Sequence, residues 1–213
     1  MKRLSLASLA ILSILALVGW GPVSHVHIAK EATKSLYYTT AQRNAVVWGS
    51  VAPDSWLIQQ GSGVIHTMLH AQVFYDSLKR LAVTAEEKAF VRGYNSHLVS
   101  DPIERAYTST KPYFGVPGEL LVDIMLAKKI PSLSYVKVIP TTATKSLMIR
   151  AWQATYSGYA WQPTGAFLDS AARTFNSWIS MAGWGSVSGA VRLAYADYYS
   201  YIQLSIAAAR SAP

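Results

Sequence analysis

Residues 84–101 have the sequence TAEEKAFVRGYNSHLVSD, and this stretch decides the fold class. Thr84 followed three residues later by Glu87 is the pattern of a capping box, in which the two side chains satisfy each other's backbone N–H groups at the start of a helix. We expect this helix to run to about Ser100 and to stop at Asp101-Pro102, because a residue before proline is disfavoured in the helical conformation.

Helical periodicity continues on both sides of this stretch. Ser24 and Thr40 are expected to cap two earlier helices, and residues 64–81 form a strongly amphipathic segment. Further helices are expected over residues 119–129, 143–156, 164–181 and 187–209. Strand-like alternation is weak and confined to residues 134–139. The pattern predicts an all-α, single-domain multi-helix bundle.

The composition restricts the chemistry that the chain can support. It has 213 residues, enough for one domain with a core that needs no cross-links, and its seven Trp and thirteen Tyr exclude a disordered chain. It has no cysteine, so disulfides and thiolate metal sites are excluded. Any metal ion must be held by His, Asp, Glu or backbone atoms.

The charge is unevenly distributed. The formal net charge is +8, and beyond Asp123 the acidic residues are Asp169 and Asp197 alone. The basic residues of the same part are Lys128, Lys129, Lys137, Lys145, Arg150, Arg173, Arg192 and Arg210. Such a surface favours anionic partners such as lipid headgroups or nucleic acid, although it also serves plain solubility.

The N-terminus has the pattern of a signal peptide. Lys2 and Arg3 precede an uncharged apolar run over residues 4–18, which is too short for a comfortable membrane span. Cleavage after Gly19 would leave Trp20 as the first residue of a helical domain over residues 20–213. We therefore expect a secreted or extracytoplasmic protein. The alternative is an uncleaved membrane anchor.

All five histidines lie between residues 25 and 97. His66 and His70 are four residues apart and so share one face of a helix, as do His97 and Asp101. An imidazole and a carboxylate side by side are what a divalent metal ion requires. Asp54 follows a proline in a turn, from which its carboxylate can point inward. Together these residues favour a shared metal site over separate core histidines.

Four segments carry a resemblance to a known family: residues 20–25 (WGPVSH), residues 49–54 (GSVAPD), His66, and residues 93–101 (GYNSHLVSD). In this order they resemble the zinc-dependent phospholipase C family, whose superfamily includes the fungal single-strand-specific nucleases. The resemblance covers about residues 20–125. It implies a helical bundle built around a cluster of zinc ions.

The resemblance also implies a ligand set. The amino group and carbonyl oxygen of Trp20, together with His25, would hold one zinc ion, and Asp101 would bridge to a second. Asp54, His66 and His97 would complete the second site, with Asp54 as a ligand or as the base that orients water. His70 is the alternative to His66, and we favour His66. The two could also act together, one as a ligand and the other as its supporting partner.

One position departs from the family pattern. The family has a histidine six residues after the bridging aspartate, where this chain has Tyr107, and the later His-x-x-x-Glu pattern is replaced by Glu119-x-x-x-Asp123. A third site formed by Glu119, Asp123 and either Glu104 or Tyr107 would be rich in oxygen and would suit Mg, Mn or Ca better than zinc. Glu119 could equally serve only the charge at a helix N-terminus. The sequence thus supports two metal positions better than three.

The expected function is that of a secreted zinc-dependent phosphoester hydrolase of the phospholipase C type. Its substrate would be a phospholipid or another phosphoester, with contact to a membrane surface. A single-strand nuclease or nucleotidase is the alternative within the superfamily. A zinc-binding protein with reduced catalysis and a membrane-anchored structural protein are alternatives of other classes. Nothing in the sequence marks a protein partner.

Overall fold

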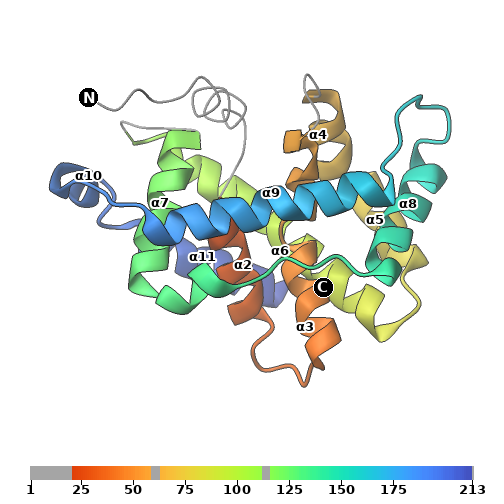
Figure 1. Ribbon diagram of the computed structural model, residues 1–213, viewed down its shortest axis with the longest axis horizontal. Coiled ribbons are helices and arrows are strands. Elements are labelled where there is room, and N and C mark those ends of the chain that lie inside the picture. The colour runs from red at the N-terminus through yellow and green to blue at the C-terminus, as the bar shows by residue number, and fades with distance from the viewer. Residues whose placement is uncertain (1–20, 59–62, 112–115, 213) are drawn as a thin grey trace.

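The computed structural model describes residues 21–58, 63–111 and 116–212 (Figure 1). Within these ranges the chain forms helices and no strand, which confirms the all-α class, and the buried apolar side chains form one core. In chain order the helices are α2 (Pro22–Ala32), α3 (Thr40–Gly49), the 3-10 helix η1 (Ala52–Ile58), α4 (Gly63–His70), α5 (Gln72–Leu81), α6 (Ala85–Thr108), α7 (Val116–Lys129), the 3-10 helix η2 (Pro131–Tyr135), α8 (Thr142–Thr155), α9 (Gly165–Trp184), α10 (Gly189–Ala194) and α11 (Tyr198–Ser211).

Helix α6 is the centre of the bundle. It contacts α2, α3, α5, α8, α11 and η1, so the elements that carry the candidate ligands all meet it or its neighbours. Helix α9 crosses one face of the molecule, with α7 and α10 toward one end and α4, α5 and α8 toward the other (Figure 1). In the described ranges, no helix combines the length and the apolar character that a membrane span requires. The expected signal segment 1–19 and Trp20 lie outside the described residues.

The predicted end of the central helix is wrong. The capping box of Thr84 and Glu87 is present as expected, but α6 continues through Pro102 to Thr108 instead of stopping at Asp101. A proline inside a helix removes one backbone hydrogen bond. Here Pro102 is exposed, so its ring does not disturb the packing of the buried side of α6. That face buries Asp101, Glu104 and Tyr107, so burial outweighs the local preference.

Two glycines let α3 and α6 cross at close range. A Cβ atom on Gly93 would lie 2.1 Å from the carbonyl oxygen of Val46, and one on Gly49 would lie 2.2 Å from that of Phe90. Any side chain at either position would push the helices apart. The close approach brings Ser50, at the end of α3, to the face of α6 that carries His97.

Helix α2 is capped from another part of the chain. Its N-cap residue is Gly21, with Pro22 in the first turn, rather than the expected Ser24. The carboxylate of Asp123 in α7 accepts hydrogen bonds from the backbone N–H groups of Val23 and Ser24, at 3.0 and 2.9 Å. Anionic groups are favoured at this end of a helix. The contact fixes the start of α2, and with it His25.

Other predicted features differ as well: Thr39, and not Thr40, caps α3. The amphipathic segment 64–81 is divided at Ala71 into α4 and α5, and the segment 187–209 is divided into α10 and α11. No strand forms at residues 134–139. There the side-chain amide of Asn176 takes the place of a strand neighbour, since it accepts from the N–H of Val138 at 2.8 Å and donates to its carbonyl oxygen at 3.0 Å.

Candidate metal centre

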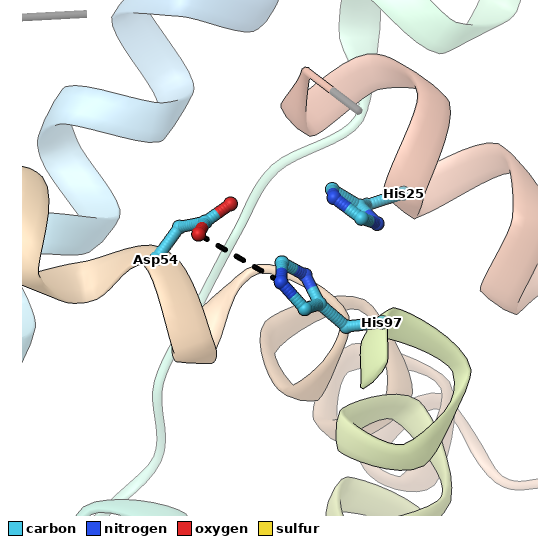
Figure 2. Close-up of side chains that lie close together, drawn as sticks. All are labelled: His25, Asp54 and His97. Carbon is cyan, nitrogen blue, oxygen red and sulfur yellow. Dashed lines mark ion pairs between the residues drawn. The ribbon is translucent and has the colours of Figure 1, made fainter. Parts of the chain in front are cut away.

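Six of the residues expected at the metal site come together in the interior. Three overlapping groups could each hold a metal ion, with ligand atoms within 4.8 Å of one another: His25, Asp54 and His97; Asp54, His66 and His70; and His70, His97 and Asp101. They come from α2, η1, α4 and α6. In Figure 2, His25, Asp54 and His97 point toward one another from three separate elements. Buried His/Asp groups that could hold a metal are therefore present in this fold.

Backbone carbonyl groups fix the orientation of two of the imidazole rings. Nδ1 of His97 lies 2.9 Å from the carbonyl oxygen of Ser50, and Nδ1 of His70 lies 2.9 Å from that of His66. A carbonyl oxygen only accepts, so each Nδ1 carries the hydrogen, and each Nε2 of a neutral ring presents a lone pair. These two Nε2 atoms lie 3.0 Å apart. Two lone pairs at this distance require a proton or a metal ion between them.

His25 is oriented in the same sense. The hydroxyl of Ser100 donates to the carbonyl oxygen of His97 at 3.0 Å, which leaves it to accept from Nδ1 of His25 at 3.3 Å. Nε2 of His25 then faces Oδ1 of Asp101 at 3.5 Å. The ring stacks on that of His97 with 3.9 Å between their centroids. The lone pair of a third histidine thus turns toward the same carboxylates.

The carboxylates of Asp54 and Asp101 lie beside these imidazoles and add further hydrogen-bond acceptors to the cluster. Oδ2 of Asp101 lies 3.3 Å from Nε2 of His70 and 3.5 Å from Nε2 of His97, while Oδ1 of Asp54 lies 3.6 and 3.7 Å from the same atoms. Oδ1 of Asp54 and both oxygens of Asp101 lack a hydrogen-bond donor. Ligand atoms on a tetrahedral zinc ion are about 3.3–3.6 Å apart, given bonds of about 2.0–2.2 Å. The four distances from carboxylate oxygen to imidazole nitrogen are close to that geometry, while the 3.0 Å between the two Nε2 atoms is shorter.

The pKa values reflect burial and mutual charge. Burial lowers the pKa of His97, but the charges of Asp101 and Asp54 outweigh it and raise that pKa to about 9. Burial raises the pKa of Asp54 to about 6. Burial also raises the pKa of Asp101, but the charge of His97 outweighs it and holds that pKa well below the usual range. Without a metal, the cluster therefore holds protons that a cation would displace.

Both alternatives for the fourth histidine reach the cluster. His70 belongs to two of the three groups and His66 to one, although the sequence favoured His66. His66 also supplies the carbonyl oxygen that orients His70, and its own ring lies edge-on to that of Trp56. Burial lowers the pKa of His66 to about 3, so its ring is neutral and able to bind a metal. Of the two, His70 has the closer contacts to the other ligands: its Nε2 lies 3.0 Å from Nε2 of His97 and 3.3 Å from Oδ2 of Asp101.

Glu104 and Glu119 form an acidic neighbourhood beside this cluster. Both side chains are almost fully buried, and both oxygens of Glu119 and Oε1 of Glu104 have no hydrogen-bond partner. Burial, reinforced by the charge of Glu104, raises the pKa of Glu119 well above its usual range, and burial raises that of Glu104 to about 8. Among the described residues, neither belongs to a group within metal-ligand distance.

Asp123 and Tyr107 lie elsewhere. Besides its bonds to the N–H groups of α2, Asp123 accepts from the Ser24 hydroxyl at 2.7 Å and from Trp178 Nε1 at 2.9 Å. Both of its oxygens are engaged, so Asp123 serves the backbone of α2 instead of a metal position. The hydroxyl of Tyr107 donates to Asp197 at 3.1 Å, near the start of α11. The structure thus does not bring the proposed third set of ligands together.

Sequence reasoning missed the groups that orient the ligands. The carbonyl oxygens of Ser50 and His66 are backbone atoms, which leave no signal in side-chain identity. Ser100 had a usable signal, because it lies three residues after His97 on the buried face of α6. Comparison with protein-family models, with characterised proteins and with solved structures finds no match for this chain.

Proposed function

We propose that the protein is a metal-dependent phosphoester hydrolase, similar in its chemistry to the zinc-dependent phospholipases C. One observation carries the proposal: imidazole nitrogens and carboxylate oxygens converge in the interior, where Oδ1 of Asp54, both oxygens of Asp101 and Nε2 of His25 have no hydrogen-bond partner. Buried acceptors without donors are costly unless a cation satisfies them. Imidazole and carboxylate ligands without thiolates suit zinc.

The positions of the two carboxylates support two zinc ions. Asp101 faces His25 through Oδ1 and faces His70 and His97 through Oδ2. It can therefore bridge one ion beside His25 and a second beside His70 and His97. Asp54 adds an oxygen to the second position, with His66 as an additional ligand or as the partner that holds His70. The proposed amino-terminal ligand Trp20 lies outside the described residues and stays an expectation from the resemblance.

The chain's own residues would bind and orient the substrate around these ions. When bound, divalent ions supply Lewis acidity toward phosphoryl oxygen atoms and a nucleophilic water near neutral pH. Asp54 would orient this water or accept its proton, because its carboxylate lies within ligand distance of His25 and His97 on one side and of His66 and His70 on the other. The nearly complete burial of His97 and Asp101 keeps other water away from them. Export through segment 1–19 belongs to the same proposal.

A metal-binding protein without turnover is the second candidate. It is favoured by Tyr107, which occupies the position of an expected ligand but is turned toward Asp197. The same cluster could then serve stability alone, because metal binding adds its free energy to that of folding. Turnover, and not metal content, separates the two candidates.

The experiment is elemental mass spectrometry of protein purified with zinc supplied, followed by hydrolysis assays. We expect two zinc ions per chain and zinc-dependent release of phosphorylcholine from phosphatidylcholine. Release of nucleotides from single-stranded DNA instead would assign the nuclease alternative. Bound zinc with neither activity would assign the non-catalytic candidate. A protein without bound zinc would contradict the proposal.

A pair of matched variants tests the ligands. His97→Ala removes a buried imidazole from the cluster, and His27→Ala removes a buried imidazole of α2 that belongs to none of the three groups. We expect His97→Ala to lose zinc and the thermal stabilisation that zinc provides, and His27→Ala to keep the zinc. Equal zinc content in the two variants would reject the cluster as the binding site.

A further inference from the structure

The C-terminal half carries cations that the fold does not neutralise. Its two acidic side chains beyond Asp123 are already paired: Asp169 with Lys145 at 2.9 Å, and Asp197 with Lys111 at 2.8 Å. Within the described residues, no carboxylate forms an ion pair with the basic side chains Lys128, Lys129, Lys137 and Arg192. Unpaired cations gathered on one surface attract an anionic partner.

Large apolar side chains are exposed among these cations. Trp184 at the end of α9 is 87% exposed, Tyr135 at the end of η2 is 81% exposed, and Leu193 in α10 is 80% exposed. Isolated exposed apolar residues are common, but a contiguous set beside positive charge marks an interaction site.

Tyr135 and Trp184 adjoin one another, because they line the same hollow. One hollow of about 400 Å³ is lined by Lys128, Tyr135, Lys137 and Trp184. A second hollow shares Lys128 with it and adds Lys129 and Arg192. These six residues form one continuous surface, which we call the basic aromatic face. It lies at the α7–α10 end of the molecule (Figure 1).

Two of the lysines are held in place. Nζ of Lys128 donates to the carbonyl oxygen of Gly183 at 2.9 Å, and Nζ of Lys129 lies over the Tyr199 ring, 4.0 Å from its centroid. Ordering these long side chains before binding reduces the entropy that a partner's binding would otherwise cost. The charge of this face is thus presented in a fixed arrangement.

We propose that the basic aromatic face binds the surface of an anionic lipid bilayer. Lysine and arginine are attracted to anionic headgroups, and Trp and Tyr favour the boundary between headgroups and acyl chains. Leu193, which follows Arg192 in α10, is exposed as well, and an exposed aliphatic side chain favours this boundary over the stacked bases of a nucleic acid. A bilayer satisfies the cations and covers the apolar side chains together.

This inference deepens the proposed function, since a phospholipase must meet its substrate at a bilayer, but it can fail independently. Binding to vesicles involves no turnover, and the face contains no residue of the His/Asp cluster. His97→Ala should therefore bind vesicles as the unaltered protein does. Loss of zinc and loss of vesicle binding are separate results that can be told apart.

The test is sedimentation with vesicles of equimolar phosphatidylcholine and phosphatidylglycerol, compared with vesicles of phosphatidylcholine alone. The partition coefficient of the protein should be higher on the anionic vesicles and should fall as salt is added. Replacing Lys128, Lys129 and Lys137 together by Gln should lower it roughly a hundredfold, at about fivefold per lysine. Trp184→Ala should lower it on the order of tenfold.

A control variant removes exposed cations and an exposed apolar side chain at the opposite end. Lys79→Gln with Lys88→Gln removes two exposed cations of α5 and α6, and Val83→Ala truncates an exposed apolar residue between them. This variant should keep the vesicle affinity within about twofold. Equal losses in the face and control variants would overturn the proposal. So would a protein that binds single-stranded DNA through the same lysines and fails to sediment with anionic vesicles.

Discussion

At the scale of single residues, Asp123 controls the position of His25 through the backbone of α2. Its carboxylate accepts four hydrogen bonds, from Val23, Ser24 and Trp178. Asp123→Asn would place an amide N–H against N–H donors, and we expect it to lower the free energy of unfolding by about 1.5–3 kcal/mol. Urea unfolding measures this. The exposed Asp76→Asn is the control and should cost less than about 0.5 kcal/mol.

Tyr107 stands where a metal-binding histidine was expected, yet its hydroxyl binds Asp197. Tyr107→Phe removes only the hydroxyl and keeps the ring that packs against Tyr201. We expect it to lower the free energy of unfolding by about 1 kcal/mol, the usual value of one hydrogen bond, and to leave the zinc content unchanged. Elemental analysis of the variant decides this, because a fall in zinc would make Tyr107 a ligand.

Residue spacing predicted part of the site and backbone geometry determined the rest. The i,i+4 spacing of His97 and Asp101 correctly placed them side by side, since both lie on one helix. The same rule could not rank His66 and His70, because the order depends on where α4 ends. That end, next to Ala71, carries no proline or glycine to mark it. The carbonyl oxygen of Ser50, which orients His97, depends on the crossing of α3 and α6.

At the scale of helices, the strongest local stop signal was overruled. Pro102 lies inside α6, where it removes one backbone hydrogen bond. We expect Pro102→Ala to raise the free energy of unfolding by about 1–3 kcal/mol, because alanine restores the donor and suits a helix interior. Chemical denaturation measures the change. Pro131→Ala is the control, since Pro131 starts the 3-10 helix η2 and should show no gain. A destabilised Pro102→Ala would mean that the proline shapes the helix around Asp101.

The helices themselves were predictable because their apolar faces repeat with helical periodicity. Their ends depended on tertiary contacts. Asp197, which ends the segment between α10 and α11, is held by Tyr107 of α6 and by Lys111, which follows the end of that helix. Neither contact could be read from residues 187–209. Asn176 likewise replaced a strand partner of Val138 from a distance of 38 residues. Local sequence indicates the type of an element, while distant partners determine its limits.

At the scale of the whole molecule, buried charge makes the metal-free protein sensitive to pH. The pKa of Glu104 is raised to about 8 from 4.5 and that of His97 to about 9 from 6.5. A group whose pKa is raised by folding contributes stability that is complete at any pH below its pKa in the unfolded chain. This stability is lost as the pH rises through its pKa in the folded protein. The depressed pKa of Asp101 acts oppositely, and its contribution is lost as the pH falls below about 3.8. The metal-free protein should therefore lose stability from about pH 5 toward pH 9.

Zinc should reverse this dependence, because the ions supply the positive charge that the carboxylates need and displace protons from the histidines. Thermal unfolding in EDTA and in excess zinc, over the range from about pH 5 to pH 8, measures the effect. We expect the gain in Tm from zinc to grow with pH. Glu104→Gln in EDTA should lose less stability on alkalinisation than the unaltered protein, at about 1.4 kcal/mol for each pKa unit removed. Equal pH dependence in EDTA and zinc would show that no exchange of protons for metal takes place in the cluster.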